Sequence, residues 1–272
     1  MQDRQAGRSW LAWVLGAVVI GGAALWLFRP VSTAPPGIEA SRPPRPVLAN
    51  LPEAVAPVAN GGIAHPIAQD AADAAVPPLA DSDEAAWSAL AALVGDDGVL
   101  ATLLRDHLVQ RWVVMIDNLT QPSVNTRVLP YQPLATTLAT SADASGALTL
   151  DTAANARRYA PFVRVFVQLD PQALAATYRR FYPLFQQAYV ELGYPRGYFN
   201  DRLVAVIDHL LLAPEPNAAI AVEATASGKL RFVDPSLESL SVGQKALLRL
   251  APEQAEAVKL QLRAIRGAIT GG

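Results

Sequence analysis

The chain has 272 residues, a formal net charge of −2 and no cysteine. The absence of cysteine excludes disulfides, thiolate zinc sites, iron–sulfur clusters and cysteine nucleophiles, and the slightly acidic balance argues against a nucleic-acid partner, which binds a basic surface. No sequence pattern points to a metal or a cofactor, so we expect neither.

Residues 10–28 form one uncharged apolar run, which follows a short N-terminal tail, residues 1–9. As a helix the run spans about 28 Å, which is enough to cross the hydrocarbon core of a bilayer. It is longer than the apolar core of about 7–15 residues found in cleaved signal peptides. We therefore predict an uncleaved, single-pass transmembrane helix at residues 10–28.

The orientation of this helix follows from its flanking arginines. Arg4 and Arg8 precede the run, whereas Arg29 alone follows it closely. Because basic residues favour the cytoplasmic side, the N-terminus is predicted to be cytoplasmic and the C-terminal part periplasmic. Arginine also far outnumbers lysine, which is typical of a GC-rich bacterial genome, so the membrane would be a bacterial inner membrane.

Residues 29–78 are rich in proline and alanine and show no periodicity. Such a segment buries too little apolar surface to offset the entropy of ordering, so we predict a disordered linker. It serves either as a spacer alone or also as a docking segment for a proline-binding partner. The remaining residues, 79–272, are enough for one globular domain.

This domain is predicted to be mostly α with two short β-hairpins. Helices are expected at residues 83–94, closed by Gly95, and from Gly98 to about Leu119, where the apolar end of the second helix could also form a strand. The hairpins are expected at residues 136–150 and 219–233. The rest is predicted to be helical, with helix starts marked by Asp170, Asn200, Asp234, Ser241 and Pro252, and with the three long helices ending near Leu192, Leu212 and Ile269.

Three polar residues, Asp201, Asp208 and His209, are the candidates for catalysis. On a helix the two aspartates share one polar stripe, but seven residues separate them by about 10.5 Å along the axis. That separation is too large for two carboxylates that share a proton and marginal for a pair that flanks a glycosidic bond. The alternative is a helix cap with salt bridges to neighbouring segments.

Two further groups are candidates for ligand binding. The stretch from Arg157 to Arg180 carries five arginines and one acid, and guanidinium groups bind carboxylates and phosphates in a bidentate manner. A stripe of aromatic residues on the helix after Asp170 could line a groove for a sugar or a peptide, or form a core. The ligand-binding candidates are Arg157, Arg158, Arg179, Arg180, Tyr182 and Tyr189.

Four segments carry a resemblance to a known family. They are YPLFQQAYVELGYPRGYFNDRLVAVIDHLLLAP (182–214), MIDNLTQP (115–122), RRYAPFV (157–163) and RFVDPSLESLSVGQKALLRLAPE (231–253). Together they resemble the bacterial domain-of-unknown-function family 3014, over essentially residues 79–269. The resemblance implies a single-pass anchored protein with a proline- and alanine-rich tether, and it implies no activity, cofactor or catalytic residue.

The leading hypothesis is an envelope protein whose periplasmic domain binds or scaffolds a protein or another envelope component. One alternative is an envelope or cell-wall hydrolase that uses Asp201, Asp208 and His209; another is a membrane-tethered cytoplasmic adaptor. The chain has no G-x-S-x-G, phosphate-binding loop or H-E-x-x-H motif that would favour an enzyme. Convergence of the carboxylates and His209 in one cleft would favour catalysis, whereas polar groups paired across helices would favour a scaffold.

Overall fold

The computed structural model describes residues 62–67, 76–125, 129–132, 138–226 and 228–271. The predicted tail, the predicted transmembrane helix at residues 10–28 and most of the predicted linker at residues 29–78 lie outside these ranges. Across the described ranges, no helix combines the length and the apolar character that crossing a bilayer requires.

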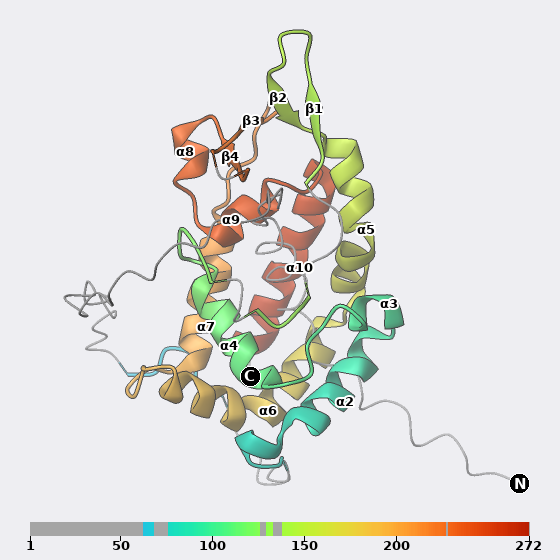
Figure 1. Cartoon of the computed structure of the whole chain (residues 1–272). Helices are drawn as coiled ribbons and strands as arrows, with labels where there is room; N and C mark the ends of the chain where they lie inside the picture. Colours follow the sequence, from blue (N-terminus) through green and yellow to red (C-terminus); the bar gives the residue numbers. More distant parts are fainter. Residues whose placement is uncertain (1–61, 68–75, 126–128, 133–137, 227, 272) are drawn as a thin grey trace, which may run out of the picture.

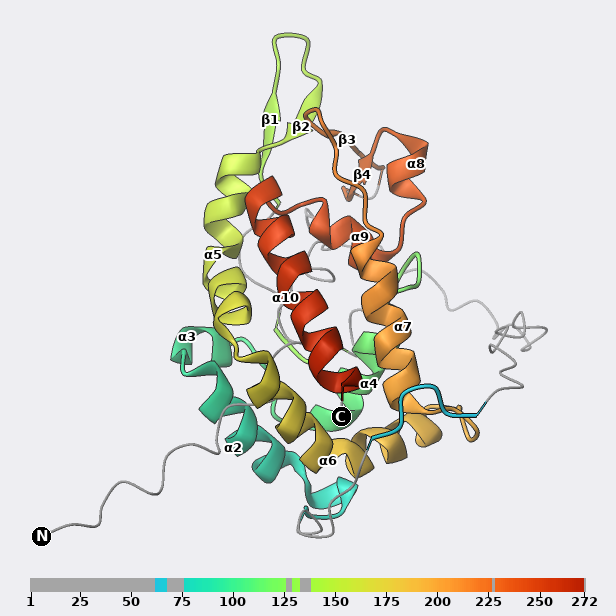
Figure 2. The same ribbon diagram turned by 180° about the vertical axis from the view of Figure 1, so that it is seen from behind.

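The described chain is mostly helical, with one small antiparallel sheet at one end (Figure 1). The long helix α10 packs against α5, α6 and α7, and α4 packs against α6 and α7. In Figure 2, α10 runs between α5 and α7. The helices are η2 (Leu79–Asp81), α2 (Asp83–Val94), α3 (Asp97–Leu100), α4 (Leu108–Asn118), α5 (Thr152–Gln168), α6 (Pro171–Glu191), α7 (Phe199–Leu211), α8 (Pro235–Glu238), α9 (Val242–Leu247) and α10 (Pro252–Thr270).

Local capping signals set several helix boundaries at the predicted residues, although Ser82 does not cap α2 through its side chain. The Asp170 carboxylate accepts hydrogen bonds from the first backbone N–H groups of α6, and Pro171 occupies the first helical position, where no N–H is needed. Ser241 and Gln244 form the predicted capping box at the start of α9. Gly95 ends α2 in the left-handed conformation, which glycine adopts without steric cost.

The helix predicted from Gly98 to about Leu119 is wrong in its first half, because the structure breaks it into α3 and α4. His107 adopts a left-handed backbone (φ 52°), and its N–H and that of Leu108 each donate to the carboxylate of Asp83 at 2.8 Å. A side chain on α2 therefore caps the start of α4, which lies 25 positions further along the chain. The apolar end of α4 is helical, so the alternative strand there is wrong.

The start of α7 also differs from the prediction. Asn200 was expected to cap this helix, but α7 begins at Phe199 and Asn200 lies inside its first turn, fully buried. Its side-chain amide donates to the carbonyl oxygens of His65 at 2.9 Å and Ile269 at 3.4 Å. The amide is therefore used in tertiary contacts and not as a local cap.

Both predicted hairpins are present and join into a single four-stranded antiparallel sheet in the order β1-β2-β3-β4. Strands β2 and β3, far apart in sequence, pair with Leu148 opposite Val222 and Thr149 opposite Ala221. Leu150, Val222, Phe232 and Leu248 form a small core beneath this sheet. The strands are β1 (Thr140–Ala142), β2 (Leu148–Leu150), β3 (Ala221–Ala224) and β4 (Leu230–Phe232).

Candidate functional site

The three catalytic candidates lie on α7, and each contacts a different part of the chain. Asp201 accepts the backbone N–H groups of Ala64 and His65. Asp208 forms a bidentate ion pair with Arg266 on α10, with oxygen–nitrogen distances of 2.6 and 3.0 Å. Each carboxylate therefore joins α7 to another segment.

His209 is also part of a tertiary contact. Its Nε2 lies 2.9 Å from the hydroxyl of Ser241, the residue that caps α9. Its carbonyl oxygen accepts from the side chain of Gln244 at 3.1 Å. Burial, and secondarily the charge of Arg202, holds the pKa of His209 below its ordinary value. The imidazole is therefore neutral at pH 7, and it positions the start of α9 against α7.

The arginine candidates are divided between two helices. On α5, Arg157 is exposed and Arg158 is half-buried beside the ring of Tyr159. On α6, Arg179 donates to the carbonyl oxygen of Ala268 at 2.7 Å, and the Arg180 guanidinium lies 5.4 Å from the ring centre of Phe181. Arg179 thus contributes to the packing of α6 on α10, and Arg157 is the member of the group most available to solvent.

The aromatic candidates are buried between α6 and α7. Tyr182 and Tyr189 are only 3% and 6% exposed, so they present no open surface to a ligand. The Tyr182 hydroxyl donates to Gln186 at 2.9 Å, and the ring of Tyr189 lies 5.5 Å from that of Phe199. Burial, and next the charge of Asp117, raises the pKa of Tyr189 to about 12. Within the helical domain these rings form core.

A buried ionic cluster joins α4 to α7 near these rings. The carboxylate of Asp117 accepts from Arg202 at 2.7 Å and from the hydroxyl of Tyr194 at 3.1 Å. Arg202 also donates to the Asp117 carbonyl oxygen at 2.7 Å and to Thr120 at 2.8 Å. Both partners of the ion pair therefore make further hydrogen bonds, and together these contacts hold α4 against α7.

A cavity of about 270 Å³ lies where the start of α10, the connection from α9 and the loop after α7 meet the sheet. Its walls include Leu150 at the end of β2, residues 214–216 and 218–220 after α7, residues 247–250, and the first two turns of α10. Asp201, Asp208 and His209 are not among its lining residues. The cavity is therefore separate from the residues that the sequence singled out.

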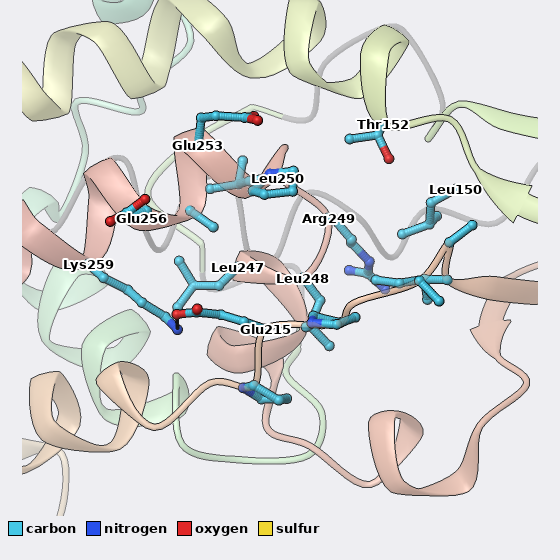
Figure 3. Close-up of a pocket in the computed structure, with 17 residues that line it drawn as sticks. Leu150, Thr152, Glu215, Leu247, Leu248, Arg249, Leu250, Glu253, Glu256 and Lys259 are labelled. Atoms are coloured by element: carbon cyan, nitrogen blue, oxygen red, sulfur yellow. Dashed lines mark hydrogen bonds and ion pairs between the residues drawn. The ribbon is translucent and has the colours of Figure 1, made fainter.

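Two buried cations line this cavity, on opposite sides (Figure 3). Lys259 on α10 is 4% exposed, and its ammonium group donates to the carbonyl oxygen of Ala213 and to Glu215, both at 2.7 Å. The hydrogen bond from Lys259, together with its charge, lowers the pKa of the Glu215 carboxyl. On this side of the cavity, a buried ammonium group therefore pairs with an exposed carboxylate and with a main-chain oxygen.

Arg249, on the other side of the cavity, is also 4% exposed (Figure 3). Its guanidinium lies 5.4 Å from the ring centre of Phe232. Burial lowers its pKa to about 10, so the group remains cationic at neutral pH.

Sequence reasoning did not single out Lys259 or Arg249, nor the buried Lys245, which lies close to Arg249 in the sequence. Lys245, which pairs with Glu238 at 2.8 Å, and Arg249 are four residues apart in a stretch, residues 241–250, that is buried throughout. The available signal was two basic residues at helical spacing inside an apolar run. Across the described residues, no three histidine, aspartate or glutamate side chains gather where they could hold a metal ion.

Comparison with known proteins gives one finding. No curated protein and no solved structure matches the chain. The family described as "Protein of unknown function (DUF3014)" matches residues 108–266, from the start of α4 to the part of α10 that carries Arg266. The match includes the buried ionic cluster, the three catalytic candidates and the whole cavity. Since it covers more than half of the sequence, the chain belongs to the DUF3014 family.

Proposed function

We propose that the chain is a single-pass protein of a bacterial inner membrane, with a helical domain in the periplasm that acts by binding or scaffolding. The proposal includes no catalytic activity because the polar candidates are dispersed. Asp201, Asp208 and His209 bond to three different segments. A hydrolase would require such groups to converge where a substrate can sit.

The membrane part of the proposal rests on the sequence. The apolar run at residues 10–28 is long enough to span a bilayer, and the arginines before it favour a cytoplasmic N-terminus. The binding part is supported by the cavity, in which the buried Arg249 lies among apolar walls. A binding partner would place an apolar group against the leucine side chains of this cavity.

Topology is tested with two reporters fused to the C-terminus, alkaline phosphatase in one protein and green fluorescent protein in another. Phosphatase activity without fluorescence supports the periplasmic location. Fluorescence without phosphatase activity would overturn it and would favour a cytoplasmic adaptor.

Binding is tested in intact cells with a photo-crosslinking amino acid placed at Glu256. This residue is exposed and lines the cavity. The matched control carries the same group at Gln187, an exposed residue of α6 that does not line the cavity. A discrete adduct from position 256 that is absent from position 187 supports binding at the cavity. The proposal of binding fails if neither position gives an adduct while the Asp201→Ala, His209→Ala double variant folds normally but does not complement a deletion strain. That pair of results would favour catalysis by Asp201 and His209.

A further inference from the structure

A short segment of the chain, residues 62–67, lies against the start of α7, more than 130 positions away in sequence. In Figure 2 this segment, drawn in blue-green, crosses the end of α7 that is nearest to α6. Three residues at that end contribute the contacts: Tyr198, Asn200 and Asp201. We call these three residues the α7 clamp.

Asp201 makes the strongest contact in the clamp. One carboxylate oxygen accepts the N–H of Ala64 at 3.0 Å, and the other accepts the N–H of His65 at 2.7 Å. Two successive amides of a peptide are thus held by one ionised group. Hydrogen bonds to a charged acceptor are about twice as strong as those between neutral groups.

The other two clamp residues extend this contact along the segment. Asn200 donates to the carbonyl oxygen of His65 at 2.9 Å, and its own position is fixed by burial inside the domain. The hydroxyl of Tyr198 accepts the N–H of Ile67 at 2.7 Å. Since Pro66 has no N–H, every amide donor from position 64 to position 67 is satisfied.

The segment is held by its main chain far more than by its side chains. Ile63 is 55% exposed, and Ala64 and Pro66 are also exposed. Ile67 alone among the apolar residues of the segment packs against the core of the helical domain. The core therefore does not depend on this segment for its packing, and the contact has the character of a bound ligand.

We propose that the α7 clamp is a peptide-binding site that recognises two free amides followed by proline and an aliphatic residue, and that residues 62–67 are its resident ligand in cis. Asp201 binds the two amides, proline occupies the one position from 64 to 67 at which the main chain donates nothing to the clamp, and the aliphatic residue occupies the place of Ile67. This inference is independent of where the domain lies and of the cavity.

The test uses the full chain in two steps. In the first, Ala64→Pro and His65→Pro together remove both donors to Asp201, which vacates the clamp without changing the helical core. In the second, a fluorescent peptide with the sequence of residues 60–70, NGGIAHPIAQD, is added, and binding is measured by anisotropy. We expect the peptide to bind the vacated chain, and to bind the unaltered chain at least about tenfold more weakly, because the resident segment competes at high effective concentration.

Two controls decide the outcome. Asp201→Ala in the vacated chain should weaken peptide binding at least about tenfold, since it removes two charge-assisted hydrogen bonds, whereas Asp208→Asn on the same helix should leave it unchanged. A peptide that carries prolines at positions 64 and 65 should not bind. The proposal is overturned if the NGGIAHPIAQD peptide does not bind the vacated chain at about 1 mM, the upper range of a weak peptide site, or if Asp201→Ala binds it equally well.

Discussion

Two glycines in helices offer a matched pair of substitutions with opposite expected signs. Gly243 lies in α9, and its amide donates to the carbonyl oxygen of Leu119 at 3.0 Å. A Cβ atom at this position would lie 2.8 Å from that same backbone oxygen and would overlap the side chain of Leu210. Gly267 lies in α10, and a Cβ atom there would meet nothing within 4 Å.

The expected magnitudes follow from these distances. Leu210 is 1% exposed and Leu119 is 3% exposed, so neither can move into open space. Overpacking costs about 1–3 kcal/mol, and the overlap with a backbone oxygen and a buried side chain puts this site at about 2–3 kcal/mol. That cost outweighs a gain of at most about 1 kcal/mol from the higher helix propensity of alanine. Gly243→Ala should thus lower the free energy of unfolding by about 1–2 kcal/mol, and Gly267→Ala should raise it by about 0.5–1 kcal/mol.

The assay is thermal unfolding of the full chain followed by far-ultraviolet circular dichroism. For a domain of this size, 1 kcal/mol shifts the Tm by about 2–4 °C. The Tm should therefore fall by about 2–8 °C for Gly243→Ala and rise by about 1–4 °C for Gly267→Ala. Equal Tm values for the two variants would refute the reasoning, because they would show that α9 is not packed against Leu119 and Leu210 as described.

Three further perturbations test the buried polar groups. Asp117→Asn deprives Arg202 of its carboxylate and should lower the free energy of unfolding, measured by chemical denaturation, by about 2–4 kcal/mol. The control Arg164→Gln removes an exposed ion pair at 3.5 Å and should change the free energy of unfolding by less than about 0.5 kcal/mol. Because burial lowers the pKa of His209, the unfolded chain binds the proton more readily, so stability should be greatest above the ordinary histidine pKa and fall as the pH decreases through the lowered value. His209→Gln should flatten this dependence in denaturation curves measured from pH 7 down to about pH 5, the range over which histidine titrates, and an unchanged slope would contradict the assignment. Lys259→Met removes a buried ammonium and leaves one carbonyl oxygen without its donor, so denaturation should show a loss of about 1–2 kcal/mol, while a loss above about 4 kcal/mol would indicate that the ion pair has a larger structural role.

The catalytic and binding candidates show how far sequence reasoning reached into the site. Periodicity placed Asp201, Asp208 and His209 on one helix, and they are on one helix. It could not state what each side chain meets, because Arg266 and Ser241 come from other parts of the chain. The buried Arg249 was missed, since charged residues are seldom placed inside unless a partner is known.

The sequence by itself determined the helical character of the domain, the starts of α6 and α9, and the positions of the two hairpins. These features depend on contacts within a few residues, such as Asp170 with the first amides of α6 and Ser241 with Gln244, so the local chain contains the whole signal. Tertiary structure alone decided the break between α3 and α4, where Asp83 caps a helix 25 residues away. It also decided the pairing of β2 with β3, the burial of Asn200 and the position of the cavity. The physical reason is that each of these features depends on the free energy of a contact between distant residues, which no local pattern records.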